Sequence, residues 1–220
     1  MGGREDVGGG VGPLNRPFDR DVLSGPVLVA GRELLGAVLE VDSPQGTVAV
    51  ALSEVEAYAG LADPASHAFR GRTARNAVMF GPAGFLYVYF VYGMHWCCNV
   101  VCGPEGEPSA VLLRAGRVVA GEELARARRP AARSTTELAR GPARLASTLG
   151  LVGTDTGADL LDPASPIRLL AGTRVPDAAV RHGPRVGVAA AADVPWRIWT
   201  DGDPTVSPYR PSTRRRRVPT

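Results

Sequence analysis

The stretch Thr47–Tyr58, TVAVALSEVEAY, decides the expected fold. Its first half alternates between branched apolar residues and small ones, which is typical of a β-strand with two different faces. Strict alternation places Glu54, Glu56 and Tyr58 on the same face as the preceding valines and Leu52. Charged groups inside an apolar strand cost free energy unless something uses them. We therefore predict a functional site where this apolar face ends.

Further strands are predicted before and after this stretch. Ala37–Val41 precedes it through a turn around Ser43–Gly46, and Ser109–Arg114 follows it later in the chain. The remaining expected elements are helices over 18–36, 121–129 and 138–150 and late strands over 186–188 and 197–199.

A hairpin is predicted between these strands, with arms Leu86–Val91 and His95–Cys102. A three-residue turn pairs Val91 with His95, and by the same register Tyr89 with Cys97. This register puts Tyr87, Tyr89 and Asn99 on one face and leaves Tyr92 at the tip, where an aromatic ring has little packing reason to be.

Length and composition favour one compact domain. A chain of 220 residues that is 45% hydrophobic can bury a large core without a second domain. We expect that domain over residues 17–210, after a flexible lead at 1–16 and before a flexible arginine-rich tail at 211–220. The net charge of +3 permits a nucleic-acid partner but does not demand one.

The cysteines and the hydropathy indicate a cytoplasmic protein. The chain's three cysteines fall within six residues, which is not the spacing of a secreted disulfide framework. No apolar run is long enough to span a membrane, and the N-terminus has no apolar signal core. We expect no membrane partner and a location in the bacterial cytoplasm, associated with the nucleoid.

A long polar connection over residues 60–79 carries His67, Arg70, Arg72 and Arg75. Connections of this length tend to be functional or disordered. Tyrosines on a strand are more often core residues, but those of the predicted hairpin lie next to this arginine-rich loop. Because flat rings stack on bases and guanidinium groups hold phosphates, nucleic acid becomes a candidate partner.

Other interpretations of these residues stay open. Glu54 and Glu56 lie roughly 7 Å apart at two strand steps, which suits an inverting glycoside hydrolase acting on sugars as well as a pair of exposed strand-edge acids. His95 and the cysteines could be imagined as a metal site, but a structural zinc site needs a second pair of ligands, and none exists in the sequence. We predict no metal and assign the cysteines to the core.

Taken in order, the motifs resemble those of the alkyladenine (3-methyladenine) DNA glycosylase family. The similarity runs through roughly residues 34–149, with a weaker continuation through Arg185–Val188 and Gly202–Pro204. The residues that carry it are Glu54–Tyr58, Asp63–His67, Arg75–Asn76, Met79–Phe80, Leu86–Tyr89, Tyr92–Met94, Asn99, Leu112–Arg114 and Gly141–Pro142.

The resemblance implies an α+β fold, a single compact domain with a curved antiparallel sheet at its core, helices around it and a protruding hairpin. It implies no metal and no organic cofactor, and a monomer that acts on double-stranded DNA containing a damaged purine. Such an enzyme flips the damaged base out of the duplex and hydrolyses its N-glycosidic bond.

The resemblance also assigns roles to single residues. Glu56 activates the water and Arg114 positions the water and the acid. The base pocket is formed by Tyr58, His67, Tyr89 and Asn99, the DNA wedge is Tyr92, and the phosphate contacts fall on Arg70, Arg72 and Arg75. The preferred lesion among 3-methyladenine, 7-methylguanine and hypoxanthine stays open, and a non-catalytic damaged-DNA-binding protein on the same scaffold is the alternative.

The absence of lysine adds a separate inference. All 25 basic residues are arginine. Glycosylases that also nick the strand do so through an amine that forms a Schiff base. We therefore predict a monofunctional enzyme that leaves an intact abasic site.

Overall fold

Strand β2 (Gly46–Tyr58) is the centre of the fold in a computed structural model that describes residues 16–91 and 93–212. Tyr92, most of the expected lead and most of the expected tail lie outside the described residues. The other strands are β1 (Val38–Ser43), β3 (Leu86–Val91), β4 (His95–Cys102), β5 (Ser109–Ala120), β6 (Ile167–Leu170), β7 (Val180–Gly183) and β8 (Arg197–Thr200).

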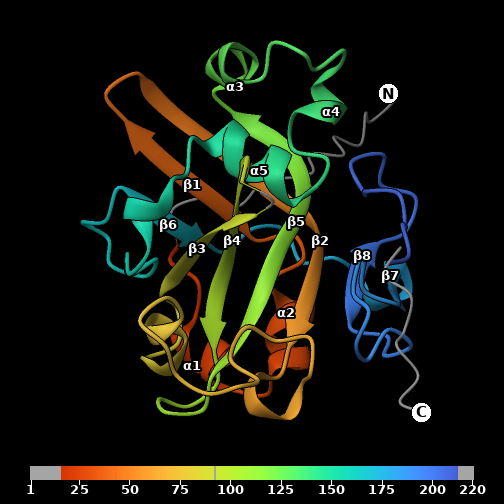
Figure 1. Cartoon of the computed structure of the whole chain (residues 1–220). Coiled ribbons are helices and arrows are strands. Elements are labelled where there is room, and N and C mark those ends of the chain that lie inside the picture. Colours follow the sequence, from red (N-terminus) through yellow and green to blue (C-terminus); the bar gives the residue numbers. More distant parts are fainter. Residues whose placement is uncertain (1–15, 92, 213–220) are drawn as a thin grey trace, which may run out of the picture.

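These strands form one antiparallel sheet with the order β3-β4-β5-β2-β1-β6, and β8 joins it through β2 and pairs with β7. One edge of β2 pairs with β5, and the other pairs first with β1 and then, over Glu54–Glu56, with β8. The two acids therefore lie in a part of the sheet where the strand has neighbours on both sides. Figure 1 shows β7 and β8 beside the central strands. The predicted α+β class with an antiparallel sheet is confirmed.

A β-bulge at Ser53 interrupts the strict alternation that was predicted for β2. Leu52 pairs with Gly116 and Glu54 with Ala115, so Ser53 is an extra residue in the ladder. The apolar row of β2 then continues through Val55 and not through Glu54, because Val48, Val50, Leu52 and Val55 all belong to the main core cluster. The expectation that the acids share a face with these valines was wrong.

The bulge has a consequence for the acids. Without it, the side chains of Glu54 and Glu56 would continue the row that faces the core. An inserted residue reverses which face each later side chain occupies. The acids and Tyr58 therefore leave the core face and emerge on the opposite face of the sheet.

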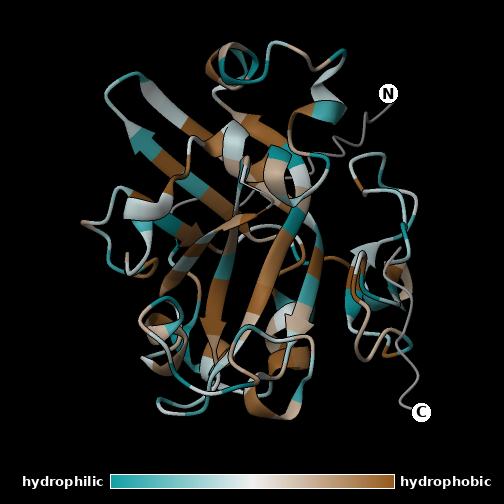
Figure 2. Cartoon of the chain, viewed as in Figure 1, coloured by the Kyte–Doolittle hydropathy of each residue, from teal (hydrophilic) through white to brown (hydrophobic). Residues whose placement is uncertain are grey.

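Helices cover the core face. They are α1 (Arg20–Ser24), α2 (Val27–Glu33), α3 (Glu122–Arg128), α4 (Thr135–Leu138) and α5 (Pro142–Leu149), with short 3₁₀ turns η1 (Gly60–Ala62), η2 (Ala77–Phe80), η3 (Gly153–Asp155) and η4 (Asp177–Ala179). Residues of α2 and α5, such as Ala30 and Leu145, join the same buried cluster as the strands. Hydrophobic residues concentrate along the central strands and hydrophilic ones in the loops (Figure 2).

Two of the predicted helices are interrupted. The helix expected over 18–36 is split between α1 and α2 at Gly25, whose backbone is extended, since Pro26 disfavours a helical residue before it. Of the one expected over 138–150, Leu138 is the last residue of α4, Gly141 has a φ of 120°, and α5 covers only Pro142–Leu149. The helix expected over 121–129 is confirmed as α3.

The late part of the chain differs more from expectation. The strand over 197–199 is confirmed as β8, but residues 186–188 form no strand, and Gly187 turns the chain with a φ of 70°. Strands β6 and β7 were not predicted. The N–H of Val186 donates to a side chain instead of a neighbouring strand, as described next.

Candidate active site

The hairpin β3–β4 has the predicted register. Val91 pairs with His95, Tyr89 with Cys97 and Tyr87 with Asn99. Cys98 faces the core cluster, whereas Cys97 is on the other face, opposite Tyr89. The side chains beside the turn are exposed, since Phe90 has 44% and Met94 69% of its surface accessible. The hairpin end thus presents apolar groups to solvent.

A small cavity of about 60 Å³ lies on the sheet face opposite the helices. The ring centroids of His67 and Tyr89 lie 4.5 Å apart at 82°, and those of Tyr87 and Tyr89 are stacked at 5.5 Å. The Nδ1 atom of His67 is 3.1 Å from the hydroxyl of Tyr87. The residues that line the cavity are Tyr58, Ala65, Ser66, His67, Met79, Tyr87, Tyr89, Asn99 and Ala110. The structure therefore brings together the four residues predicted for a base pocket.

Asn76 holds the loop that carries His67 over this cavity. Its amide donates to the carbonyls of His67 at 2.9 Å and Gly71 at 3.0 Å, and its Oδ1 accepts the N–H of Thr73. Because Asn76 is only 2% exposed, these bonds are shielded from water. Asn76 is one of the residues that carry the family resemblance, but its role could not be predicted from the sequence.

The three arginines of the loop are exposed, but they differ in what they contact. Arg75 lies with its guanidinium 5.9 Å from the centroid of Tyr89 and donates to the carbonyl of Phe90. Desolvation lowers the pKa of His67, and the positive charge of Arg75 lowers it further. Arg70 and Arg72 precede Arg75 in the same loop, and both side chains are exposed.

Glu56 is wholly buried beside the cavity. Its Oε1 accepts the N–H of Val186 at 2.7 Å and lies 3.2 Å from Nη1 of Arg114. Its Oε2 accepts the hydroxyl of Tyr58 at 2.9 Å. A carboxylate oxygen can accept two hydrogen bonds, so with respect to the described residues Oε2 has one further acceptor position. The Tyr58 hydroxyl links this oxygen to the cavity, because Tyr58 is one of the lining residues. Burial, followed by the charge of Glu56, raises the pKa of Tyr58 well above its ordinary value, which keeps this hydroxyl a donor.

Glu54 is also wholly buried, but its surroundings are different. Its Oε1 accepts from Arg114 at 2.8 Å, Arg197 at 2.7 Å and the Ser207 hydroxyl at 2.9 Å, and its Oε2 accepts the Ser207 N–H. Burial alone would raise the pKa of Glu54, but the two guanidinium groups outweigh it and hold the pKa below its usual value. A carboxylate bound in this way does not suit the sugar-hydrolysing pair considered from the sequence.

Arg114 joins the two acids. It is the extra residue of a second bulge, since Glu54 pairs with Ala115 and Val55 with Leu113. Bulges re-aim side chains, and this one places a guanidinium against both carboxylates. Desolvation would lower the pKa of Arg114, but Glu56 and Glu54 reverse the effect and raise it. The guanidinium of Arg114 is therefore held between the two carboxylates by an ion pair with each of them.

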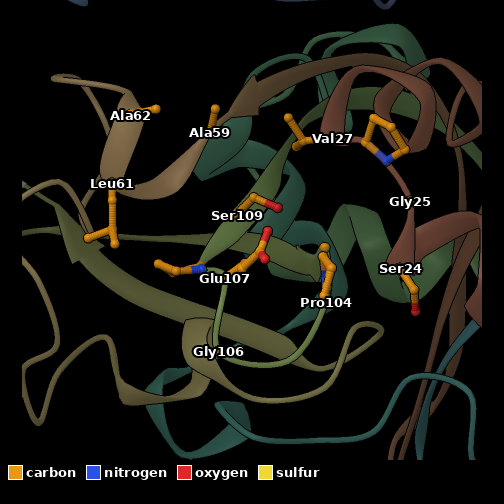
Figure 3. A pocket seen from close by; sticks show the side chains of 13 residues that line it. Ser24, Gly25, Val27, Ala59, Leu61, Ala62, Pro104, Gly106, Glu107 and Ser109 are labelled. Carbon is orange, nitrogen blue, oxygen red and sulfur yellow. The ribbon is translucent and has the colours of Figure 1, made fainter.

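A larger cavity lies elsewhere. It measures about 570 Å³, and its walls come from the α1–α2 junction, η1 and the β4–β5 connection (Figure 3). Its lining is mainly apolar and includes Leu61 and Pro108 but none of the predicted site residues. We place the candidate site at the smaller cavity, because rings and an amide line it and the hydroxyl of one of those rings, Tyr58, contacts a buried acid.

Two further observations concern ligands and membranes. Among residues 16–91 and 93–212, no three side chains of His, Cys, Asp or Glu gather as metal ligands would, and the three cysteines are free thiols. The described helices include none with the length and apolar character needed to cross a bilayer.

Comparisons with known proteins place the chain among the DNA glycosylases. A family model described as "Methylpurine-DNA glycosylase (MPG)" matches residues 21–204. A protein of Streptomyces avermitilis is 55% identical over 207 residues, 93% of this chain and 97% of the relative. One of Nocardia farcinica is 56% identical over 190 residues (84% and 88%), and one of Mycobacterium tuberculosis 49% over 195 (86% and 92%).

All three relatives carry the provisional name 3-methyladenine DNA glycosylase. The chain belongs to the methylpurine-DNA glycosylase family. The family resemblance inferred from its motifs is confirmed.

Proposed function

We propose that this chain is a monofunctional DNA glycosylase that removes alkylated or deaminated purines from duplex DNA by hydrolysis of the N-glycosidic bond. The observation that carries the proposal is the buried Glu56 carboxylate, which the Tyr58 hydroxyl links to the pocket of rings and whose Oε2 keeps a second acceptor position as far as the described residues go. The substrates considered are 3-methyladenine, 7-methylguanine and hypoxanthine.

In this proposal Glu56 accepts a proton from water as the water attacks C1′ of the deoxyribose. Its negative charge also offsets the positive charge that builds on the sugar in the transition state. Alkylation at N3 or N7 makes the purine a cationic, good leaving group, so it needs less acid catalysis than a neutral base such as hypoxanthine. Arg114 keeps the carboxylate in place without touching the base, through its ion pairs with both acids.

The rings account for base binding. Extruding a nucleotide costs a few kcal/mol of lost stacking, so one surface must receive the base and another must fill the gap. Tyr89 stacks on the flipped base, with Tyr58 and His67 around it and Asn99 selecting among purines. Tyr92, outside the described residues, acts as the wedge, and the exposed arginines Arg70, Arg72 and Arg75 contact phosphates.

The proposal is tested with three duplexes of one sequence that contain hypoxanthine, 7-methylguanine or undamaged purine. Incubation followed by alkaline cleavage of abasic sites should cut at a damaged base and leave the undamaged duplex whole. The absence of cleavage at every lesion, with the protein shown to be folded, would favour the damaged-DNA-binding alternative.

Borohydride trapping tests the monofunctional assignment. The chain has no lysine, so the side chains offer no amine to form a Schiff base with the abasic sugar. We expect no borohydride-stable protein–DNA adduct under conditions in which excision is complete, with a strand-nicking glycosylase as positive control. A trapped adduct that persists after the α-amino group is acetylated would contradict the prediction.

His67 predicts a pH dependence that distinguishes charged from neutral lesions. Desolvation, followed by the charge of Arg75, places the pKa of His67 below its ordinary 6.5, so the ring is neutral at pH 7. Below its pKa it becomes a cation beside the bound base and repels an alkylated, cationic purine. The ratio of excision of 7-methylguanine to hypoxanthine should be constant above pH 6.5 and fall below it. A His67→Gln variant should show a flatter ratio, and an equal fall in both proteins would assign the effect to another group.

A further inference from the structure

Arg185 is a wholly buried charge for which neither the motifs nor the family assignment gives a role. It is 1% exposed, and so is its partner Asp63. The two side chains form a bidentate pair, with Nη1 of Arg185 at 2.5 Å from Oδ2 and Nη2 at 2.9 Å from Oδ1. Such forked geometry fixes orientation as well as charge.

The pair ties the loop of the pocket to β2. The carboxylate of Asp63 also accepts the N–H groups of Ala59 at 3.3 Å and Ala65 at 3.0 Å, which shapes the chain leading to the histidine of the pocket. Nη1 of Arg185 donates to the carbonyl of Ala57 at 3.0 Å, one residue after the buried acid. Segments that are more than 120 residues apart in sequence thereby meet beside the site.

Arg185 also reaches Glu56 by two routes. Its guanidinium lies 4.6 Å from the ring centroid of Tyr58, whose hydroxyl donates to Oε2 of Glu56. The next residue, Val186, donates its backbone N–H to Oε1. The ring of Trp196, 5.3 Å away, provides a further surface for the guanidinium. Two of the groups that contact Glu56, the Tyr58 hydroxyl and the Val186 N–H, are thus adjacent to Arg185.

Stability alone is a poor reason for this arrangement. A buried ion pair often contributes no more than apolar side chains of the same volume, because desolvation offsets the attraction. Nε of Arg185 is buried and finds no acceptor among the described residues, which adds a cost. An apolar substitute would fill the space, but it would give neither the fork to Asp63 nor the face against Tyr58.

We propose that Arg185, oriented by Asp63, is a positioning residue that fixes the Tyr58 hydroxyl and the Val186 N–H on Glu56. This inference rests on the proposed function, because it concerns the same reaction. It predicts that Arg185 affects the rate of excision more than the binding of DNA.

Arg185→Lys tests it, with Arg197→Lys as the matched control. Both arginines are buried, both pair with an acid and both lie over a ring, but Arg197 contacts Glu54 and Trp199. Lysine keeps the charge and loses the fork. We expect the single-turnover rate at saturating enzyme to fall about 10- to 100-fold in Arg185→Lys, with a smaller fall in Arg197→Lys at equal folded fraction. Binding of the lesion duplex should change little in either.

A double variant separates positioning from general support of the fold. In a Tyr58→Phe background the hydroxyl on Glu56 is already missing, so the effect of Arg185→Lys should be at least about threefold smaller than in the wild type. Should Arg185→Lys not fold, Trp196→Leu against Trp199→Leu gives the same comparison through the rings. The larger loss of rate should be in Trp196→Leu.

The outcomes are distinct. Equal losses in each matched pair, or fully additive effects with Tyr58→Phe, would overturn the positioning role while leaving the glycosylase proposal intact. A wild-type protein that excises none of the lesions would instead remove the proposed function on which this inference rests.

Discussion

Replacing Glu54 by Gln is expected to lower the free energy of unfolding by about 3–5 kcal/mol, because it leaves the buried charges of Arg114 and Arg197 without their shared acid. For a chain of this size, a change of that magnitude lowers Tm by roughly 6–20 °C. Thermal unfolding followed by circular dichroism measures it. The loss of stability comes from the broken ion pairs inside the sheet and does not depend on catalysis.

The pH dependence of this effect has a defined sign. The pKa of Glu54 is lower in the folded protein than its ordinary 4.5. Its contribution to stability is therefore fully present above pH 4.5 and is lost as the pH falls through the folded pKa. The Tm difference between wild type and Glu54→Gln should be constant above that pH and shrink below it.

Glu122→Gln is the control for this experiment. Glu122 forms an exposed pair with Arg126, four residues along α3, and both side chains are about half accessible. Exposed pairs of this kind contribute little to stability. A Tm for Glu54→Gln that matches that of Glu122→Gln would contradict the role assigned to the buried cluster.

Replacing Glu56 by Gln should separate binding from cutting. Glutamine has the same shape and can still accept the N–H of Val186, but it can no longer take a proton from water or offset charge on the sugar. The single-turnover rate of excision is expected to fall by about 100- to 10,000-fold. Affinity for the same lesion duplex should stay within about tenfold, a change of about 1.4 kcal/mol.

Gel shift and single-turnover cutting on one hypoxanthine duplex provide both readouts. Arg114 retains Glu54 in this variant, so the protein should remain folded. A variant that cuts at the wild-type rate would remove Glu56 from the reaction. A variant that neither binds nor cuts would show that the acid supports the pocket and not the chemistry.

The sequence predicted the parts of the site that depend on local pattern. The register of the β3–β4 hairpin follows from its turn length, so the shared face of Tyr87, Tyr89 and Asn99 could be predicted from the order of residues alone. Alternation along β2 put Glu54 and Glu56 on one face, and the structure agrees, since both contact Arg114.

What alternation could not reveal is the bulge at Ser53. An inserted residue leaves no trace in a pattern of apolar and small side chains, yet it reverses which face the later residues occupy. The same limit hid the turn at Gly187, where two valines flank a glycine as they would in a short strand.

Long-range ion pairs were equally invisible. Arg185 and Asp63 are separated by 122 positions, and nothing in either local segment indicates that one will orient the other. Glu54 likewise owes its environment to Arg197 and Ser207, which come from the end of the chain. Such partners are set by the topology that brings β8 beside β2 and not by the residues near β2 in sequence.

We propose that the chemistry belongs to Glu56 and not to its neighbour Glu54 on the same strand. The most direct test compares single-turnover excision of hypoxanthine by Glu56→Gln and Glu54→Gln, at a temperature where both are folded. We predict at least about a 100-fold loss for Glu56→Gln and a much smaller one for Glu54→Gln. The reverse order, or equal losses, would rule out Glu56 as the acid that carries the reaction.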